Sequence, residues 1–253
     1  MSSFSTPAIM LRRIDFGDYD LIITFLTLRS GKIPVIVKSA KKSTKRFSGL
    51  LELFSVLEIV CSSGRGKGLP VLQEAVLKHP FSGIRSSIQK TAYASYWAEL
   101  INESMEEGEE QPAFYHLFHH VLKALDTDDI PEAAISILFQ MRFMSISGLS
   151  PNLTGCGVCR VEMEEMERDS VFFDLGKGCL ICQRCASGSA KKISLSKGTI
   201  KHLRWVEGGP LEKAERIRFS SESLREGLEL LEAFVPFHLG KEPKSLKFLK
   251  QIR

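Results

Sequence analysis

The sequence predicts a multidomain α+β protein, and three observations lead to this prediction. Short β-branched runs separated by glycine-rich turns fill residues 8–80. After Pro80, apolar residues recur every three or four positions, which is the spacing of amphipathic helices. Five of the six cysteines lie between Cys156 and Cys185. We therefore expect a β-rich head, a helical body and a small insertion held together by a metal ion.

The β-rich head contains five candidate strands. They lie at Ala8–Leu11, Leu21–Thr27, Ile33–Val37, Leu50–Val60 and Leu69–Leu77. In the fourth run, the leucines and the isoleucine from Leu51 to Ile59 share one parity and Glu52 has the other, as in a strand with one buried face. Five short strands in so few residues favour a small barrel, for which the OB-fold is the common solution.

The rest of the chain predicts a helical domain in two parts. One apolar stripe runs from Ile84 through Ile88 to Ile101, and a second runs from Phe114 to Leu125. Further helices are expected at 133–148, 196–207 and 221–239, the last with Ser220 or Ser221 as its N-cap. The predicted domains are 1–80 (barrel), 81–150 (helices, first part), 151–195 (cysteine ribbon) and 196–253 (helices, C-terminal part).

The net charge of +4 is unevenly distributed along the chain. Residues 1–80 carry 12 Lys and Arg against 6 Asp and Glu, whereas residues 81–150 carry 4 against 10. A basic head indicates a polyanionic partner. No apolar run approaches the roughly 20 residues that cross a bilayer, and the opening residues show no secretion signal. We expect a cytoplasmic protein that does not bind membranes.

The strongest candidate for that partner's site is the segment from Lys38 to Arg46, with five cations in nine residues and no acid. Its cations suit salt-sensitive contacts with nucleic-acid phosphates, and Phe47 offers a stacking surface for a base. The alternative is an ordinary solvated loop. The predicted DNA-binding residues are Lys38, Lys41, Lys42, Lys45 and Arg46, with Arg12, Arg65 and Lys67 as extensions of the same surface.

Two cysteine hooks, Cys156-x-x-Cys159 and Cys182-x-x-Cys185, predict one structural Zn²⁺. Each hook brings two thiolates to the same side of a turn, and tetrahedral zinc takes four of them at about 2.3 Å. Cys179 is also correctly spaced from Cys182, so five thiols compete for four places. A disulfide cluster is the alternative, which the absence of an export signal disfavours.

No catalytic residues are predicted. The chain has no phosphate-binding loop of the Gly-x-x-x-x-Gly-Lys type and no Gly-x-Ser-x-Gly elbow. His116 and His120 are four residues apart on a predicted helix but lack an evident third metal ligand. A zinc hydrolase is disfavoured because four thiolates leave no coordination position for water. We expect a protein that is not an enzyme.

Several short motifs follow one another in order along residues 8–240. They are Ile9-x-Leu11, Gly17-x-x-Asp20, Thr27 with Gly31, Lys38-x-Ala40-Lys41-Lys42 with Arg46 and Leu50, Ala94-x-Tyr96-x-x-Glu99-Leu100, Phe139-Gln-Met-Arg-Phe-Met leading to Gly148, Pro151, Leu153 and Cys156, and Phe173 leading to Gly178, Cys179, Cys182 and Cys185. This ordered set resembles the bacterial RecO family of recombination mediators. Members tend to carry two glycines where this chain has Gly178 and Cys179, which favours Cys179 as the spare thiol.

The resemblance implies an N-terminal OB-fold, a helical domain with a zinc ribbon, and no bond-breaking activity. It also implies binding of single- and double-stranded DNA and annealing of complementary strands. The implied partners are RecR and the C-terminal tail of single-strand DNA-binding protein, with RecA loading as the outcome in the bacterial nucleoid. A zinc-stabilised protein–protein adaptor with incidental DNA contact is the alternative function.

Overall fold

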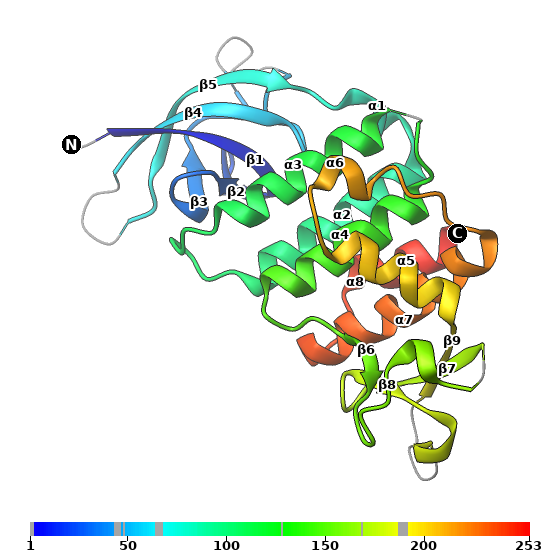
Figure 1. Cartoon of the computed structure of the whole chain (residues 1–253). Coiled ribbons are helices and arrows are strands. Elements are labelled where there is room, and N and C mark those ends of the chain that lie inside the picture. The colour runs from blue at the N-terminus through cyan, green and yellow to red at the C-terminus, as the bar shows by residue number, and fades with distance from the viewer. Residues whose placement is uncertain are drawn as a thin grey trace. The chain divides into compact units, whose positions relative to one another are not determined.

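The computed structural model describes residues 3–42, 47, 49–63, 68–127, 129–167, 169–186 and 192–253. The chain forms two compact units (Figure 1). Unit 1 comprises Met1–Thr127 with Phe248–Arg253, and unit 2 comprises Asp128–Lys247. The predicted α+β class is confirmed, whereas the four-part domain division stays a prediction.

Unit 1 begins with a closed five-stranded barrel in the order β1-β2-β3-β5-β4 (Figure 1). Its strands are β1 (Ser3–Phe16), β2 (Asp20–Thr27), β3 (Gly31–Val37), β4 (Val56–Ser62) and β5 (Val71–His79). Neighbouring strands are antiparallel except β3 and β5, which run parallel and pair at Ile36 and Val71. The barrel predicted as an OB-fold is thereby confirmed.

Alternation along the strands fills the barrel with apolar side chains. In β4, for example, Leu57, Ile59 and Cys61 are buried, while Glu58 between them is partly exposed. Buried and partly exposed side chains also alternate along most of β2 and β3. Because a slip by one residue would turn every apolar side chain outward, this pattern fixes the strand register.

The fourth strand is shorter than predicted, since it begins at Val56 rather than at Leu50. Phe54 has a φ of 70°, a left-handed conformation that ends an extended run. Its backbone N–H donates to the carbonyl oxygen of Met10, and Met10 N–H donates to the carbonyl oxygen of Ser55. These bonds lie where the β1–β2 register shifts, and the buried Phe54 ring holds the strained backbone in place.

The helices of unit 1 are α1 (Ser82–Ser86), α2 (Ile88–Ser104) and α3 (Pro112–Asp126). The first predicted helix is interrupted, because Ser87 is extended and its hydroxyl accepts a hydrogen bond from the N–H of Lys90 to cap α2. Ile88 is therefore exposed, which corrects its placement in the buried stripe. The barrel contacts the loop between α2 and α3 at Gly31, where a Cβ would lie 1.9 Å from the carbonyl oxygen of Glu109.

Unit 2 combines helices with a small sheet in the order β6-β8-β7-β9. Its elements are α4 (Glu132–Ile146), β6 (Asn152–Cys156), the 3-10 helix η1 (Met163–Glu165), β7 (Ser170–Asp174), β8 (Cys179–Ile181), the 3-10 helix η2 (Gln183–Cys185), β9 (Lys192–Ser196), α5 (Lys197–Glu207), α6 (Leu211–Ala214) and α7 (Ser221–Leu239). The chain ends in α8 (Lys244–Ile252), whose residues are divided between the units.

The helices at 196–207 and 221–239 are confirmed as α5 and α7, and Ser220 caps α7 by accepting from the N–H of Ser223. Helix α4 packs against α5 and α7, with Gly227 of α7 close to Ile137 of α4. Phe173 of β7 meets Phe234 of α7 edge-on at 5.4 Å between ring centroids, which joins the sheet to the helices. In the described parts of the chain, no helix combines the length and apolar character needed to span a membrane.

Candidate metal centre and candidate nucleic-acid interface

Four cysteine thiols meet in unit 2. The Sγ atoms of Cys156, Cys159, Cys182 and Cys185 all lie within 4.8 Å of one another. Cys159 Sγ and Cys182 Sγ are 3.6 Å apart. Four sulfurs at zinc's usual bond length of about 2.3 Å form a tetrahedron with edges of about 3.8 Å. The donor set and its spacing therefore fit one tetrahedral Zn²⁺.

Hydrogen bonds favour the ionised form of Cys156. Burial opposes its ionisation, but backbone N–H groups of Cys182, Cys159 and Val158 outweigh burial and lower its pKa to about 6. Cys185 differs, because its hydrogen bond with Cys182 and its desolvation raise its pKa to about 12. Thiolates this close repel one another, and a bound divalent cation would hold all four ionised.

Cys179 lies beside the four thiols and is not a member of their group. Its Sγ packs against the first hook, where a Cβ on Gly157 would lie only 2.2 Å away. Burial and the nearby carboxylate of Asp174 raise its pKa. The structure thus brings together the four ligands predicted from the sequence and places the spare thiol against the glycine of the first hook.

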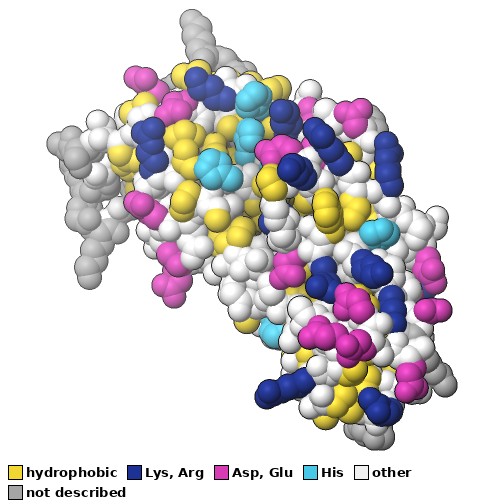
Figure 2. Space-filling view, viewed as in Figure 1, with side chains coloured by type: hydrophobic (Ala, Val, Ile, Leu, Met, Phe, Trp, Pro, Cys, Tyr) yellow, Lys and Arg dark blue, Asp and Glu magenta, His cyan; other side chains and the backbone are white. Residues whose placement is uncertain are grey.

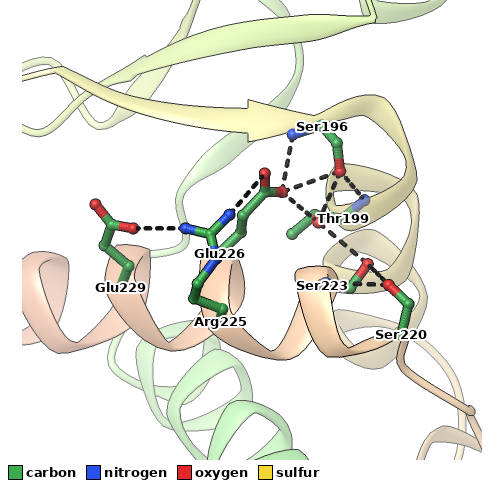
Figure 3. Close-up of polar contacts among 7 residues, drawn as sticks. All are labelled: Ser196, Thr199, Ser220, Ser223, Arg225, Glu226 and Glu229. Carbon is green, nitrogen blue, oxygen red and sulfur yellow. Dashed lines mark hydrogen bonds and ion pairs between the residues drawn. The ribbon is translucent and has the colours of Figure 1, made fainter.

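The ribbon is tied to the helices by a buried carboxylate (Figure 3). Glu226 of α7 accepts hydrogen bonds at Oε2 from the Ser196 N–H at 2.9 Å, the Ser196 hydroxyl at 3.0 Å and the Thr199 hydroxyl at 2.6 Å. Ser196 ends β9 and caps α5. This network fixes the last ribbon strand, and the sequence does not predict it because its members come from β9, α5 and α7.

In unit 1, the described part of the basic segment turns beside the β1–β2 hairpin. Lys38 Nζ lies 2.8 Å from Asp20 Oδ2, and Lys41 Nζ lies 3.0 Å from Asp15 Oδ2. Lys42 Nζ sits over the Tyr19 ring, 3.4 Å from its centroid. Predicted Arg12 is exposed on β1, whereas the predicted residues Lys45, Arg46, Arg65 and Lys67 lie outside the described residues.

Asp15 and Asp20 form ion pairs with Lys41 and Lys38 at the surface of the protein. The hydrogen bond from Lys38, followed by one from the Ser39 N–H, lowers the pKa of Asp20. Ion pairs between exposed side chains are weak, because water screens them and two long side chains must be ordered. A phosphate group can therefore compete with Asp15 and Asp20 for these cations.

Phe47, which is predicted from the sequence to offer a stacking surface for a base, is not the aromatic residue exposed beside these lysines. Phe47 is only 5% exposed and packs into the barrel core, so it cannot stack on a base. Phe16 and Tyr19 of the hairpin are each 46% exposed instead. The signal that could have found them is the Phe16-Gly-Asp-Tyr19 turn, where Gly17 adopts a φ of 59° between two strand candidates.

Histidine side chains gather on unit 1, as Figure 2 shows in cyan. His119 of α3 lies 5.7 Å from His79 of β5 and 6.3 Å from Tyr115, measured between ring centroids. Burial lowers the pKa of His119, and the positive charges of His79 and Lys123 lower it further. Among the described residues, histidines form no group spaced for a metal ion.

Comparison with known proteins places the chain in a family. Residues 1–81 match the model "Recombination protein O N terminal", and residues 85–247 match "Recombination protein O C terminal". A "DNA repair protein RecO" from Desulfatibacillum aliphaticivorans is 43% identical over the whole chain and 98% of the relative. One from Desulfosudis oleivorans is 42% identical, and one from Syntrophus aciditrophicus is 31% identical. The chain therefore belongs to the RecO family of DNA repair proteins.

Proposed function

We propose that this protein is a DNA-binding recombination mediator. It binds single- and double-stranded DNA, anneals complementary strands and, together with RecR, helps load RecA on DNA coated by single-strand DNA-binding protein. It acts on the bacterial nucleoid in the cytoplasm. Family membership supports these roles, and no step of the proposed function breaks a covalent bond.

The observation that carries the proposal is the edge of the barrel beside the β1–β2 hairpin. Lys38, Lys41 and Lys42 contact the hairpin that carries the exposed rings of Phe16 and Tyr19. Lysines neutralise phosphates without reading sequence, and exposed rings offer stacking surfaces to unpaired bases. This combination suits a protein that handles single strands of any sequence.

Titration of labelled single-stranded DNA at several salt concentrations tests this proposal. Lys41→Gln combined with Lys42→Gln should weaken binding to all sequences alike and reduce the salt slope by about 1.4, since each lost phosphate contact removes about 0.7. Arg29→Gln is the matched control, because Arg29 is an exposed cation at the opposite end of β3. An unchanged slope in the double variant would remove the barrel edge from the proposed interface.

We propose that the cysteine cluster holds one structural Zn²⁺ through Cys156, Cys159, Cys182 and Cys185. The ion, when bound, neutralises four thiolates and cross-links the two hooks. The binding energy of such an ion is folding energy, because the unfolded chain holds no assembled site. The close fit of the sulfur spacing supports this role.

A second candidate function, a protein–protein adaptor, is favoured by a groove in unit 2. Its lining residues are Asp129, Ile130, Pro131, Glu215, Arg216, Ile217 and Arg218. The lining combines apolar residues with two arginines and two acids, and the arginines suit an acidic, apolar peptide, such as the proposed tail of single-strand DNA-binding protein. Arg216→Glu with Arg218→Glu should abolish binding of such a peptide. Peptide binding without DNA affinity in the full chain would favour the adaptor function.

A further inference from the structure

The two tryptophans of the chain have opposite environments. Trp97 of α2 is fully buried, whereas Trp205 of α5 is 59% exposed. Tryptophan is highly buried on average because of its large apolar ring. The exposed indole of Trp205 therefore requires an explanation beyond the packing of unit 2.

The core of unit 2 does not use Trp205. The buried face of α5 consists of Thr199, Ile200, Leu203 and Val206. Trp205 lies on the opposite face with Lys201, one helical turn earlier. Gly208 and Gly209 follow the helix, and the positions of a Cβ on either have no atom within 4 Å. The surface beyond the indole is thus open.

The charged side chains of α5 itself are mainly positive. Helix α5 carries Lys197, Lys201 and Arg204 against one carboxylate, Glu207. Lys197 is engaged, because its Nζ donates to the carbonyl oxygens of Glu164 and Met166. Lys201 and Arg204 are exposed and lie on the same side of α5 as the indole. Figure 2 shows such cations interspersed with acids over unit 2.

An acid competes for these cations. Glu164 of η1 lies 2.9 Å from Arg204 NH1, and Lys201 also attracts its carboxylate. Just beyond α5, Arg142 donates hydrogen bonds to the carbonyl oxygens of Gly208 and Gly209, which holds a further cation near the helix C-terminus. A negatively charged partner with flat rings would satisfy both the indole and the cations.

We propose that the exposed face of α5 is a second contact for single-stranded DNA, in which Trp205 stacks on a base and Lys201 and Arg204 bind flanking phosphates. Unpaired bases expose the ring faces that such stacking needs, whereas a duplex hides them. The proposal rests on the proposed DNA-binding function and adds a site in unit 2 to the barrel edge in unit 1.

Tryptophan fluorescence tests this contact in the full chain. Trp97 is fully buried, so of the two tryptophans only Trp205 can contact a ligand. Unlabelled oligo-dT should quench the emission as it binds. Trp205→Phe leaves only Trp97 and should show no quenching, although it keeps a ring and most of the affinity. Trp205→Ala should weaken binding by at least about fivefold. Both variants should fold, because the side chain is exposed.

Glu164→Gln provides a test in the opposite direction. It frees Arg204 from its ion pair, so binding should tighten. In the contrary outcome, labelled DNA binds while Trp205 emission stays constant, and Trp205→Ala binds DNA as tightly as the wild type. This result would exclude α5 as a DNA contact but would leave the proposed DNA-binding function intact. If quenching requires an acidic peptide instead of DNA, the face docks a protein. If the chain binds no DNA at low salt, both proposals fall.

Discussion

The hydroxyl of Thr199 donates a hydrogen bond of 2.6 Å to the carboxylate of Glu226, which joins α5 to α7. Glu226 is only 6% exposed, and the same oxygen also accepts from Ser196 at the end of the ribbon. A buried carboxylate is stable only when such donors replace water. Glu226 therefore contributes a buried polar connection between the ribbon and the helices, beside the ring contact of Phe173 with Phe234.

Replacing Glu226 should destabilise unit 2. Glu226→Ala leaves the buried donors of Ser196 and Thr199 without their acceptor, which should cost about 2–3 kcal/mol. Glu226→Gln keeps one acceptor oxygen and should cost less. Glu229→Ala is the control, because Glu229 only pairs with Arg225 at the exposed i,i+4 position and should cost about 0.5 kcal/mol or less. Urea unfolding measures all three.

Removing one hook cysteine should release the metal. Cys156→Ser or Cys182→Ser should reduce the zinc content from about one ion per chain to nearly none and lower the melting temperature, because ligand binding stabilises folding. Cys179→Ser removes a thiol outside the group of four and should retain the ion. Elemental analysis of the purified variants measures this, and zinc loss in Cys179→Ser would overturn the ligand assignment.

Asp15 should weaken DNA binding by holding Lys41. Asp15→Asn removes the 3.0 Å ion pair and should tighten binding of single-stranded DNA up to about fivefold at low salt. Asp18→Asn removes the same charge from the hairpin tip, where no ion pair is seen among the described residues, and should have a smaller effect. Equal effects of the two variants would show that only net charge matters.

The pH dependence of stability should carry a contribution from His119. Its pKa is lowered in the folded state, so the unfolded chain binds its proton more readily. This contribution is fully present above the unfolded pKa of about 6.5 and is lost as the pH falls through the lower folded pKa. His119→Gln should therefore reduce the loss of stability measured by urea unfolding between pH 7.5 and pH 5.

His238 provides a comparison in unit 2, because burial alone lowers its pKa. His238→Gln should also reduce the acid sensitivity, but it should leave the His119 contribution in place. A double variant should lose less stability in acid than either single variant. Identical acid profiles for His119→Gln and the parent protein would contradict the His119 assignment.

Local patterns predicted most of the regular elements. The parity of Leu57 and Ile59 located a barrel strand, and Ser220 marked the start of α7. The errors arose where the backbone departs from its local pattern. Phe54 and Ser87 carry no sequence signal strong enough to show that one is left-handed and the other extended.

The candidate site was predictable only in part, for a similar reason. Hook spacing reduced the candidates to five cysteines, because a CxxC turn is local, and the family resemblance then favoured Cys179 as the spare thiol outside the group of four. The ion pairs of Lys38 and Lys41 depend on a hairpin that folds back over 18 residues or more, and the burial of Phe47 depends on the whole barrel. Such long-range contacts leave no periodic trace in the sequence.

The barrel seam has a mechanical consequence. β3 and β5 meet at the single pair Ile36 and Val71, supported by the hydrogen bond from Ile36 N–H to the carbonyl oxygen of Pro70. The other strand pairs have registers of seven or more positions. Transient opening should begin at this narrow junction, whose amides would exchange with deuterium before those of any other pair.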